Sequence, residues 1–184
     1  MTKKIILITG ASGEIGENLI KYFSKKINYQ IIALDLNTPD SNNKIHEFYQ
    51  GSIMNDALLN KINEKYLLDQ IYHLAAILST KAEKNPEFAE DINVNGTMKI
   101  FDLALHQSLK QKKIIKIFFP SSIAVYNIKN NDDNEQFIRE NMLCNPTTVY
   151  GKNKLFCENI GTALDRYGNE NQLHIDFRCI RFPG

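Results

Sequence analysis

Tyr150 and Lys154 stand four residues apart and combine two side chains that could move a proton. On a helix this spacing places both side chains on one face, one turn apart. An ammonium beside a phenol stabilises the phenolate, so we expect Lys154 to lower the pKa of Tyr150 below its reference value of about 10. Such a tyrosine can take the proton of a substrate alcohol while a second group takes the hydride. Pairs with this spacing also arise by chance, so the pair gains meaning only from the residues around it.

A hydroxyl that could hold the substrate oxygen comes from Ser122. Ser121 and Ser122 follow the apolar run 114–119, which we interpret as a buried strand. Ligands of parallel α/β sheets bind outside the carboxyl ends of the strands, so a hydroxyl just after this run faces the expected site. We expect Ser122 to hold the substrate oxygen and Ser121 to satisfy backbone groups at the end of the strand.

The amino end of the chain has the pattern of a phosphate-binding turn. An apolar run without alternation, 3–9, is typical of a buried parallel strand, and Gly10, Gly13 and Gly16 follow it at a spacing of three. Glycine allows a sharp turn and lets backbone N–H groups approach a ligand. The helix expected to follow points its positive end at the same place, so the pattern predicts a pyrophosphate site.

Asp35 extends this prediction to a dinucleotide. It ends the second expected strand, 30–35, and stands 19 residues after Gly16. A carboxylate there can accept hydrogen bonds from the hydroxyls of an adenosine ribose and repels a 2′-phosphate. Leu36 and Asn37 supply no arginine that would attract such a phosphate. The order of these elements favours NAD over NADP.

Strands and helices alternate along the rest of the chain. This alternation predicts a doubly wound α/β fold, a parallel sheet of about six strands in the order 3-2-1-4-5-6 with helices on both faces. A polar insert is expected at 127–140. The expected strands are 3–9, 30–35, 46–49, 70–76, 114–119 and 173–180, and the expected helices are 13–27, 56–65, 86–109 and 147–167.

The composition excludes several classes of protein. The 184 residues include 22 basic and 21 acidic ones, so the charge suggests neither a nucleic acid nor a membrane as partner. The three cysteines lack CxxC spacing and the four histidines lack metal-ligand spacing, so we expect no metal site. We expect a cytoplasmic enzyme. Within its core we expect His73 to be a histidine with satisfied hydrogen bonds and Cys179 to be a small hydrophobic residue.

Four motifs together resemble a known family. They are the TGxxGxxG turn at 9–16, the Asn-Val-x-Gly-Thr motif at 93–97, Ser122, and the YxxxK pair of Tyr150 and Lys154. All four resemble the extended short-chain dehydrogenase/reductases, also called the NAD-dependent epimerase/dehydratase family. The resemblance implies a Rossmann fold, NAD as cofactor, and catalytic roles for Ser122, Tyr150 and Lys154. It also implies a set of NAD-binding residues: Gly10, Ser12, Gly13, Glu14, Ile15, Gly16, Asp35, Leu36, Ser52, Ile53, Leu74, Ala75, Ala76, Asn93, Tyr150, Lys154 and Phe182.

Longer stretches resemble one branch of that family, the short-chain L-threonine 3-dehydrogenases. They are 73–79, 83–86, 120–125, 146–151 and 181–184. The resemblance implies oxidation of the threonine hydroxyl by NAD to give 2-amino-3-oxobutanoate, a step of threonine catabolism. It further implies that the substrate is bound by Ser79, Ser122, Thr148 and Tyr150.

Three features depart from the family pattern. Lys152 and Asn153 fill the middle of the YxxxK pair, where apolar and small residues are commoner. Ser52 stands where the adenine pocket usually has an aspartate, although a serine can still bond the adenine amine. Two-domain enzymes of this kind exceed ~250 residues. We therefore expect residues 1–184 to form the NAD-binding domain, with the substrate domain largely absent beyond 184.

Two other functions stay open. The same serine, tyrosine and lysine could serve a sugar hydroxyl in a nucleotide-sugar epimerase or dehydratase. The chain could also be an NAD-binding module without catalysis. A homodimer is expected through the helices 86–109 and 147–167, because Leu103, Phe156 and Ile160 fall on their outward sides.

The role given to Asp35 is testable by titration with both cofactors. We expect the chain to bind NAD more tightly than NADP, because the carboxylate accepts from the ribose and repels a 2′-phosphate. Asp35→Ala should weaken NAD binding and narrow the difference between the two dissociation constants. Equal affinities of the unchanged chain for NAD and NADP would contradict this role.

Overall fold

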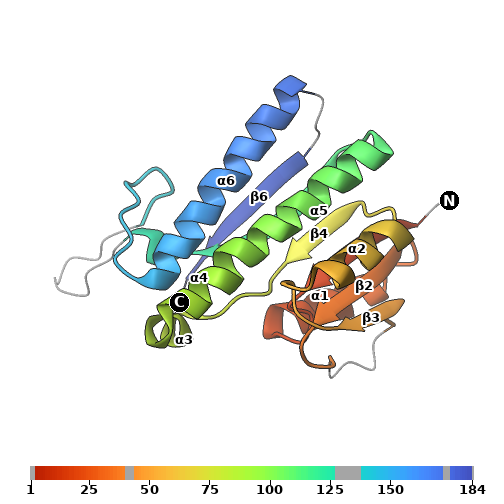
Figure 1. The fold of residues 1–184 in the computed structure, drawn as a ribbon, viewed down its shortest axis with the longest axis horizontal. Helices are drawn as coiled ribbons and strands as arrows, with labels where there is room; N and C mark the ends of the chain where they lie inside the picture. The colour runs from red at the N-terminus through yellow and green to blue at the C-terminus, as the bar shows by residue number, and fades with distance from the viewer. Residues whose placement is uncertain (1–2, 40–43, 127–137, 172–174, 184) are drawn as a thin grey trace.

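A six-stranded parallel sheet forms the centre of the molecule (Figure 1). The computed structural model describes residues 3–39, 44–126, 138–171 and 175–183. Every neighbouring pair of strands is parallel, which confirms the doubly wound α/β fold and the order 3-2-1-4-5-6. In sheet order the strands are β3 (Glu47–Gln50), β2 (Tyr29–Asp35), β1 (Lys4–Thr9), β4 (Gln70–His73), β5 (Ile115–Ser122) and β6 (Ile175–Phe182).

Helices cover both faces of this sheet. One apolar cluster packs α2, α5 and α6 against one face, and a second cluster packs α1 against the other. A π-helical turn (Asp91–Asn95) precedes α5, and a 3₁₀ turn (Ile123–Tyr126) follows β5. The α-helices are α1 (Glu14–Ser24), α2 (Asp56–Lys65), α3 (Ser79–Lys84), α4 (Pro86–Glu90), α5 (Gly96–Gln111) and α6 (Val149–Asn171).

The helical region after β4 differs from the prediction. The single helix expected over 86–109 is divided into α4, the π-helical turn and α5, and the short helix α3 was not predicted. At the division, the backbone carbonyl of Asn93 accepts hydrogen bonds from the Thr97 hydroxyl at 2.6 Å and the Cys157 thiol at 3.3 Å. The thiol comes from α6, a partner that periodicity within the helix cannot reveal.

Several strand ends also differ from the prediction. Strand β4 ends at His73 rather than at residue 76, because Leu74 and Ala75 lie against the turn at Gly10. Strand β5 continues to Ser122, so the two serines lie within the strand and not after it. Pro120 is tolerated there because the pairing with β4 ends at Phe118, so the proline has β6 as its one neighbouring strand.

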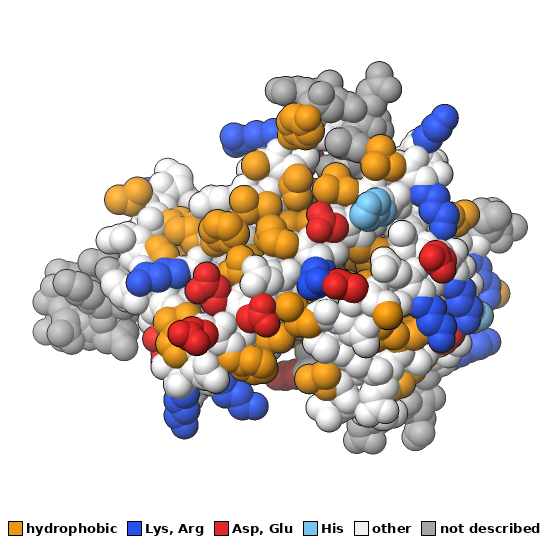
Figure 2. All heavy atoms as spheres, viewed as in Figure 1, with side chains coloured by type: hydrophobic (Ala, Val, Ile, Leu, Met, Phe, Trp, Pro, Cys, Tyr) orange, Lys and Arg blue, Asp and Glu red, His pale blue; other side chains and the backbone are white. Residues whose placement is uncertain are grey.

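The predicted exposure of Leu103 and the predicted burial of Cys179 are wrong, and Ile160 is less exposed than predicted. Leu103 is buried with 4% of its surface exposed, so it cannot contribute to an outer surface. Ile160 packs partly against the core, whereas Phe156 is 48% exposed. Figure 2 shows several hydrophobic side chains gathered on one face of the molecule. Cys179 is exposed, not a core residue, because it lies on the edge strand β6.

Part of the expected polar insert, 127–137, lies outside the described residues. Among the helices that the structure describes, none is long and apolar enough to cross a lipid bilayer.

His73 is a core residue whose ring connects three elements. Its Nδ1 lies 2.7 Å from the Thr9 hydroxyl of β1, and its Nε2 lies 3.0 Å from the Thr97 hydroxyl of α5. Thr97 donates its own proton to the Asn93 carbonyl, so it can only accept from Nε2–H, and Thr9 must then donate to Nδ1. The network therefore assigns one neutral tautomer. Burial lowers the pKa of His73 to about 3, with a smaller contribution from the charge of Lys154.

This burial predicts a loss of stability in mild acid. The unfolded chain binds a proton on His73 below pH ~6.5 and the folded chain does not, so the free energy of unfolding falls as pH falls from there towards 3. Between pH 7 and pH 5 this contribution is about 2 kcal/mol. Denaturant unfolding of His73→Gln should show a weaker pH dependence than the unchanged chain. The exposed His106→Gln is the control, and equal pH dependence in all three proteins would contradict the prediction.

Candidate functional site

The predicted site residues lie at one edge of the sheet. All six strands run in the same direction, so their carboxyl ends meet at the same edge. The glycine turn follows β1 there, Asp35 ends β2, and Ser52 lies two residues after β3. At the other half of this edge, Ser122 ends β5 and pairs in register with Phe182 of β6.

The three glycines of the turn have different structural reasons. Gly10 has a φ of 67°, and a Cβ on it would lie 2.6 Å from the backbone nitrogen of Ala75. A Cβ on Gly16 would lie 2.6 Å from the carbonyl oxygen of Ala11. A Cβ on Gly13 would meet the Gly10 carbonyl oxygen at 3.4 Å, an ordinary contact. The fold itself therefore requires Gly10 and Gly16 but leaves space at Gly13.

That space lies at an uncapped helix end. Gly13 is the N-cap of α1, and no side chain caps this helix. The first backbone N–H groups of the helix, at Glu14 and Ile15, have no intrahelical acceptor by geometry. An open glycine beside these donors fits the pyrophosphate of a dinucleotide.

Asp35 holds the turn from the neighbouring strand. One carboxylate oxygen accepts from the backbone nitrogen of Ser12 at 2.9 Å, and the other accepts from that of Asn37 at 3.0 Å. Each oxygen has a further lone pair, so the carboxylate can still accept from a ribose hydroxyl. Leu36 beside it is exposed and uncharged.

The residues after β3 and β4 are held by local contacts. The Ser52 hydroxyl accepts from the backbone nitrogen of Met54 at 3.1 Å, and Ile53 is buried. After β4, the side-chain amide of Asn93 accepts from Ile77 N at 2.7 Å and donates to Ile77 O at 3.0 Å. Asn93 thus fixes the segment that follows Leu74, Ala75 and Ala76.

Lys154 is 4% exposed, and its ammonium is surrounded by one carbonyl and two rings. The Nζ donates to the carbonyl oxygen of Pro120 at 2.7 Å and lies 4.5 Å from the Phe119 ring centroid and 5.5 Å from that of Tyr150. Burial lowers the pKa of Lys154 to about 8, partly opposed by Cys157 and Glu158. Tyr150 and Lys154 therefore share one face of α6, as expected.

The expected direction of the Tyr150 pKa is wrong. Burial raises the pKa of this phenol, because the tyrosine is largely enclosed. The ammonium of Lys154 lies over the tyrosine ring and bonds to Pro120 rather than to the hydroxyl. Spacing on a helix predicted the shared face correctly but not the partner that the lysine selects.

The hydroxyls expected to face the substrate lie on adjoining segments. Ser122 accepts from the backbone nitrogen of Ala124 at 3.1 Å, and a Cβ on Gly151 would overlap the Ala124 carbonyl, so α6 begins directly against this segment. Thr148 accepts from Gly151 N at 3.0 Å, which leaves its hydroxyl proton for another acceptor. Ser79 is exposed at the start of α3.

Ser121 does not have its expected role. Its buried hydroxyl has no hydrogen-bond partner among the described residues, whereas it was expected to satisfy the backbone. The side-chain nitrogen of Asn153, one residue before Lys154, is likewise buried and without a partner in the described part of the chain.

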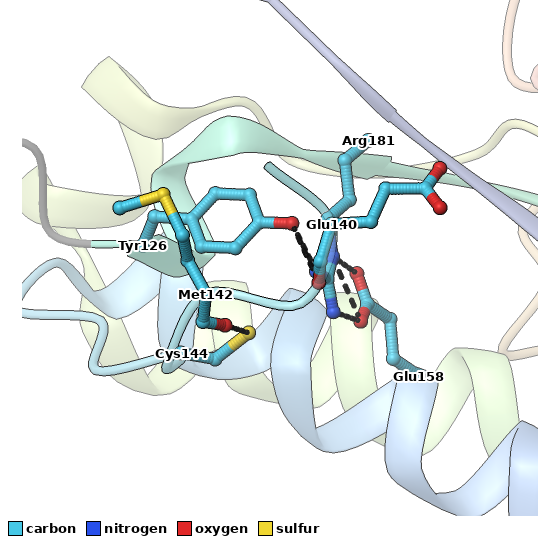
Figure 3. Close-up of polar contacts among 6 residues, drawn as sticks. All are labelled: Tyr126, Glu140, Met142, Cys144, Glu158 and Arg181. Atoms are coloured by element: carbon cyan, nitrogen blue, oxygen red, sulfur yellow. Dashed lines mark hydrogen bonds and ion pairs between the residues drawn. The ribbon is translucent and has the colours of Figure 1, made fainter. Parts of the chain in front are cut away.

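An ion pair that the sequence did not suggest lies beside Ser122 and Phe182. Both oxygens of the buried Glu158 accept from Arg181, from Nε at 3.0 and 3.2 Å and from Nη2 at 2.6 Å (Figure 3). The other nitrogen of Arg181 donates to the Tyr126 hydroxyl and, at 3.3 Å, to the Glu140 carbonyl. Glu158 stands four residues after Lys154, a spacing that could have indicated its place on the same helix face.

A cavity of about 500 Å³ adjoins this ion pair. It lies at the carboxyl ends of β5 and β6, and its lining residue Ile123 directly follows Ser122 in the chain. Its lining residues are Ile123, Tyr126, Ile138, Glu140, Cys179, Ile180 and Arg181. In the described ranges, no group of three or more His, Cys, Asp or Glu side chains could hold a metal ion.

Comparison with known proteins gives a family match over nearly the whole chain. Residues 6–182 match the family described as "NAD dependent epimerase/dehydratase family". An uncharacterized epimerase/dehydratase of Staphylococcus saprophyticus is 32% identical over 184 residues, with 98% of this chain and 53% of that protein covered. The chain thus spans about half the length of the curated relatives it matches.

Solved structures of similar fold include threonine dehydrogenases and sugar epimerases. A monomeric L-threonine 3-dehydrogenase from a metagenome is 35% identical with a TM-score of 0.81, covering 97% of this chain and 53% of that one. The GalE-like L-threonine dehydrogenase of Cupriavidus necator is 27% identical with a TM-score of 0.77, covering 97% and 55%. The nucleoside-diphosphate-sugar epimerase of Agrobacterium tumefaciens is 25% identical with a TM-score of 0.80, covering 100% and 53%.

The different environments of two glycines predict different results of one substitution. Gly13→Ala should fold with a melting temperature near that of the unchanged chain but bind NAD at least ~10-fold more weakly, because the methyl group occupies the space for the pyrophosphate. Gly16→Ala should destabilise the chain itself, because its Cβ meets backbone atoms. Thermal unfolding and NAD titration separate the two effects. Unchanged NAD affinity in a folded Gly13→Ala would contradict the prediction.

Proposed function

The chain belongs to the NAD-dependent epimerase/dehydratase family, and from that premise we propose that it supplies the NAD-binding domain of an L-threonine 3-dehydrogenase. The observation that carries the catalytic part is the shared face of α6, on which Tyr150 lies beside the buried Lys154 at the end of β5. The substrate is supported by similarity, since several threonine dehydrogenase structures are 27–35% identical to this chain.

The residues that would hold NAD lie along the carboxyl edge of the sheet. The backbone at Gly13 and the start of α1 would bind the pyrophosphate, and Asp35 would accept from the adenosine ribose. Lys154, beside Tyr150, would bind the ribose next to the nicotinamide. Bound NAD supplies the acceptor for the hydride that leaves the alcohol carbon.

The chain's own residues would handle the proton. Ser122 would donate a hydrogen bond to the substrate hydroxyl, and ionised Tyr150 would accept the hydroxyl proton as the carbonyl forms. Because burial raises the pKa of Tyr150, a nearby positive charge is needed to produce the phenolate. Lys154 provides one, provided that it stays protonated with a pKa of about 8.

Ser79 and Thr148 would bind the amino-acid part of threonine. Ser79 is exposed at the start of α3, and the Thr148 hydroxyl keeps a proton to donate to a carboxylate oxygen. Further contacts to so small a substrate are proposed to come from residues outside this chain, since the relatives are about twice as long.

A nucleotide-sugar epimerase or dehydratase is the second candidate. The similarity to the Agrobacterium tumefaciens epimerase, with a TM-score of 0.80 over the whole chain, favours it next. A sugar hydroxyl could occupy the same position between Ser122 and Tyr150. NADH formation with L-threonine, compared with turnover of a panel of nucleotide-sugars, distinguishes the two candidates in the complete enzyme.

The proton acceptor can be tested in the complete enzyme. Tyr150→Phe should lower the turnover of threonine by a factor of about 10² or more and leave the NAD dissociation constant nearly unchanged, because the ring stays and the base is lost. Tyr167→Phe, which removes a phenol farther along α6, is the control and should keep full turnover. Full activity of Tyr150→Phe across the pH range would exclude the proposed role.

A further inference from the structure

The first turn of α6 is capped by a carboxylate from another helix. One oxygen of Glu83, on α3, accepts from the backbone nitrogen of Val149 at 2.7 Å and from that of Tyr150 at 3.4 Å. Thr148 satisfies the next two donors, because its hydroxyl accepts from Gly151 N and its carbonyl accepts from Lys152 N, both at 3.0 Å. All four leading N–H groups of α6 therefore have acceptors, and the first two depend on Glu83.

This cap joins the two helices that carry the candidate substrate-side residues. Ser79 and Glu83 stand four residues apart on α3, so both side chains fall on one side of that helix. On α6, Glu83 binds the amides of Val149 and Tyr150, the two residues that directly follow Thr148. One carboxylate thus connects α3 to the beginning of α6.

The contact also satisfies the electrostatics of the helix end. The N-terminus of a long helix carries a partial positive charge, and α6 is 23 residues long. Glu83 is 66 residues before Val149 in the chain, so local sequence does not bring the two together. A local N-cap such as Thr148 would satisfy only part of this end, whereas Glu83 adds a formal charge and a tertiary connection.

We propose that Glu83 is a positioning residue. By binding the first two amides of α6, it fixes the position of Tyr150 relative to Ser79 on α3. The inference rests on the proposed function only for the roles of Tyr150 and Ser79 in turnover. The position of Tyr150 itself does not depend on the substrate.

Three substitutions separate the reach of the side chain from its charge. Glu83→Gln keeps the length and an acceptor oxygen, Glu83→Asp keeps the charge but is one methylene too short, and Glu83→Ala removes both. The control is Glu64→Ala, which truncates an exposed glutamate on α2. Far-UV circular dichroism establishes that each variant is folded.

The first measurement uses the chain of 184 residues and needs no activity. In Glu83→Ala and Glu83→Asp, amide hydrogen exchange at Val149 and Tyr150 should accelerate by about 10-fold or more, because these amides lose their acceptor. The ring signal of Tyr150 in a tyrosine-labelled NMR spectrum, assigned with Tyr150→Phe, should shift. Glu83→Gln and Glu64→Ala should keep both observations near those of the unchanged chain.

The second measurement is turnover by the complete enzyme. Glu83→Ala should lower kcat by about 10-fold and raise KM for threonine with little change in NAD affinity, and Glu83→Gln should restore most of kcat. If the complete enzyme does not oxidise threonine, the proposed function fails while the exchange and ring signals still test Glu83. Unchanged exchange at Val149 and Tyr150 in a folded Glu83→Ala overturns the proposal. Equal kcat values in Glu83→Ala and Glu64→Ala overturn it as well.

Discussion

The buried ammonium of Lys154 is the interaction on which the candidate site depends. Removing a charge from water is costly, and within this site the partners are the Pro120 carbonyl and the faces of two aromatic rings. Because Pro120 belongs to β5 and Lys154 to α6, the contact fixes the helix over the end of the strand. Tyr150 lies one helical turn before Lys154, and Ser122 lies two residues after Pro120, so this contact holds together the two elements that carry them.

The charge of Lys154 also affects His73, on the side of the site that is near the glycine turn. The Phe119 ring lies beneath Lys154 and stacks on His73 with 6.2 Å between the ring centroids. Burial and the charge of Lys154 both keep His73 neutral, and the neutral ring bonds to Thr9, the residue before the glycine turn. A chain of contacts through Phe119 and His73 thus connects Lys154 to the residue before the glycine turn.

Three carboxylates hold segments that form the edge of the site. Asp35 binds the glycine turn, Glu83 binds the first turn of α6, and Glu158 binds Arg181 at the end of β6. Loops at a strand end have little apolar surface to bury, so their positions depend on directed hydrogen bonds instead. The backbone N–H groups of turns and helix ends are the donors that such loops have in most abundance.

The sequence by itself determined the glycine turn, the Asp35 strand end and the shared face of Tyr150 and Lys154, because each rests on local periodicity or on spacing. It also determined the order and direction of the strands, because strands that alternate with helices form a parallel sheet with right-handed crossovers. The tertiary structure alone decided the contacts between elements. It turned the ammonium of Lys154 towards Pro120, so that burial, and not the lysine, dominates the pKa of Tyr150. It divided the helix after Pro86 at Asn93, where a thiol from α6 binds the freed carbonyl, and it brought Glu83 to the amides of α6. Such partners are dozens of residues apart in the chain, and no local pattern records which distant donor or charge will meet a given side chain once the layers have packed.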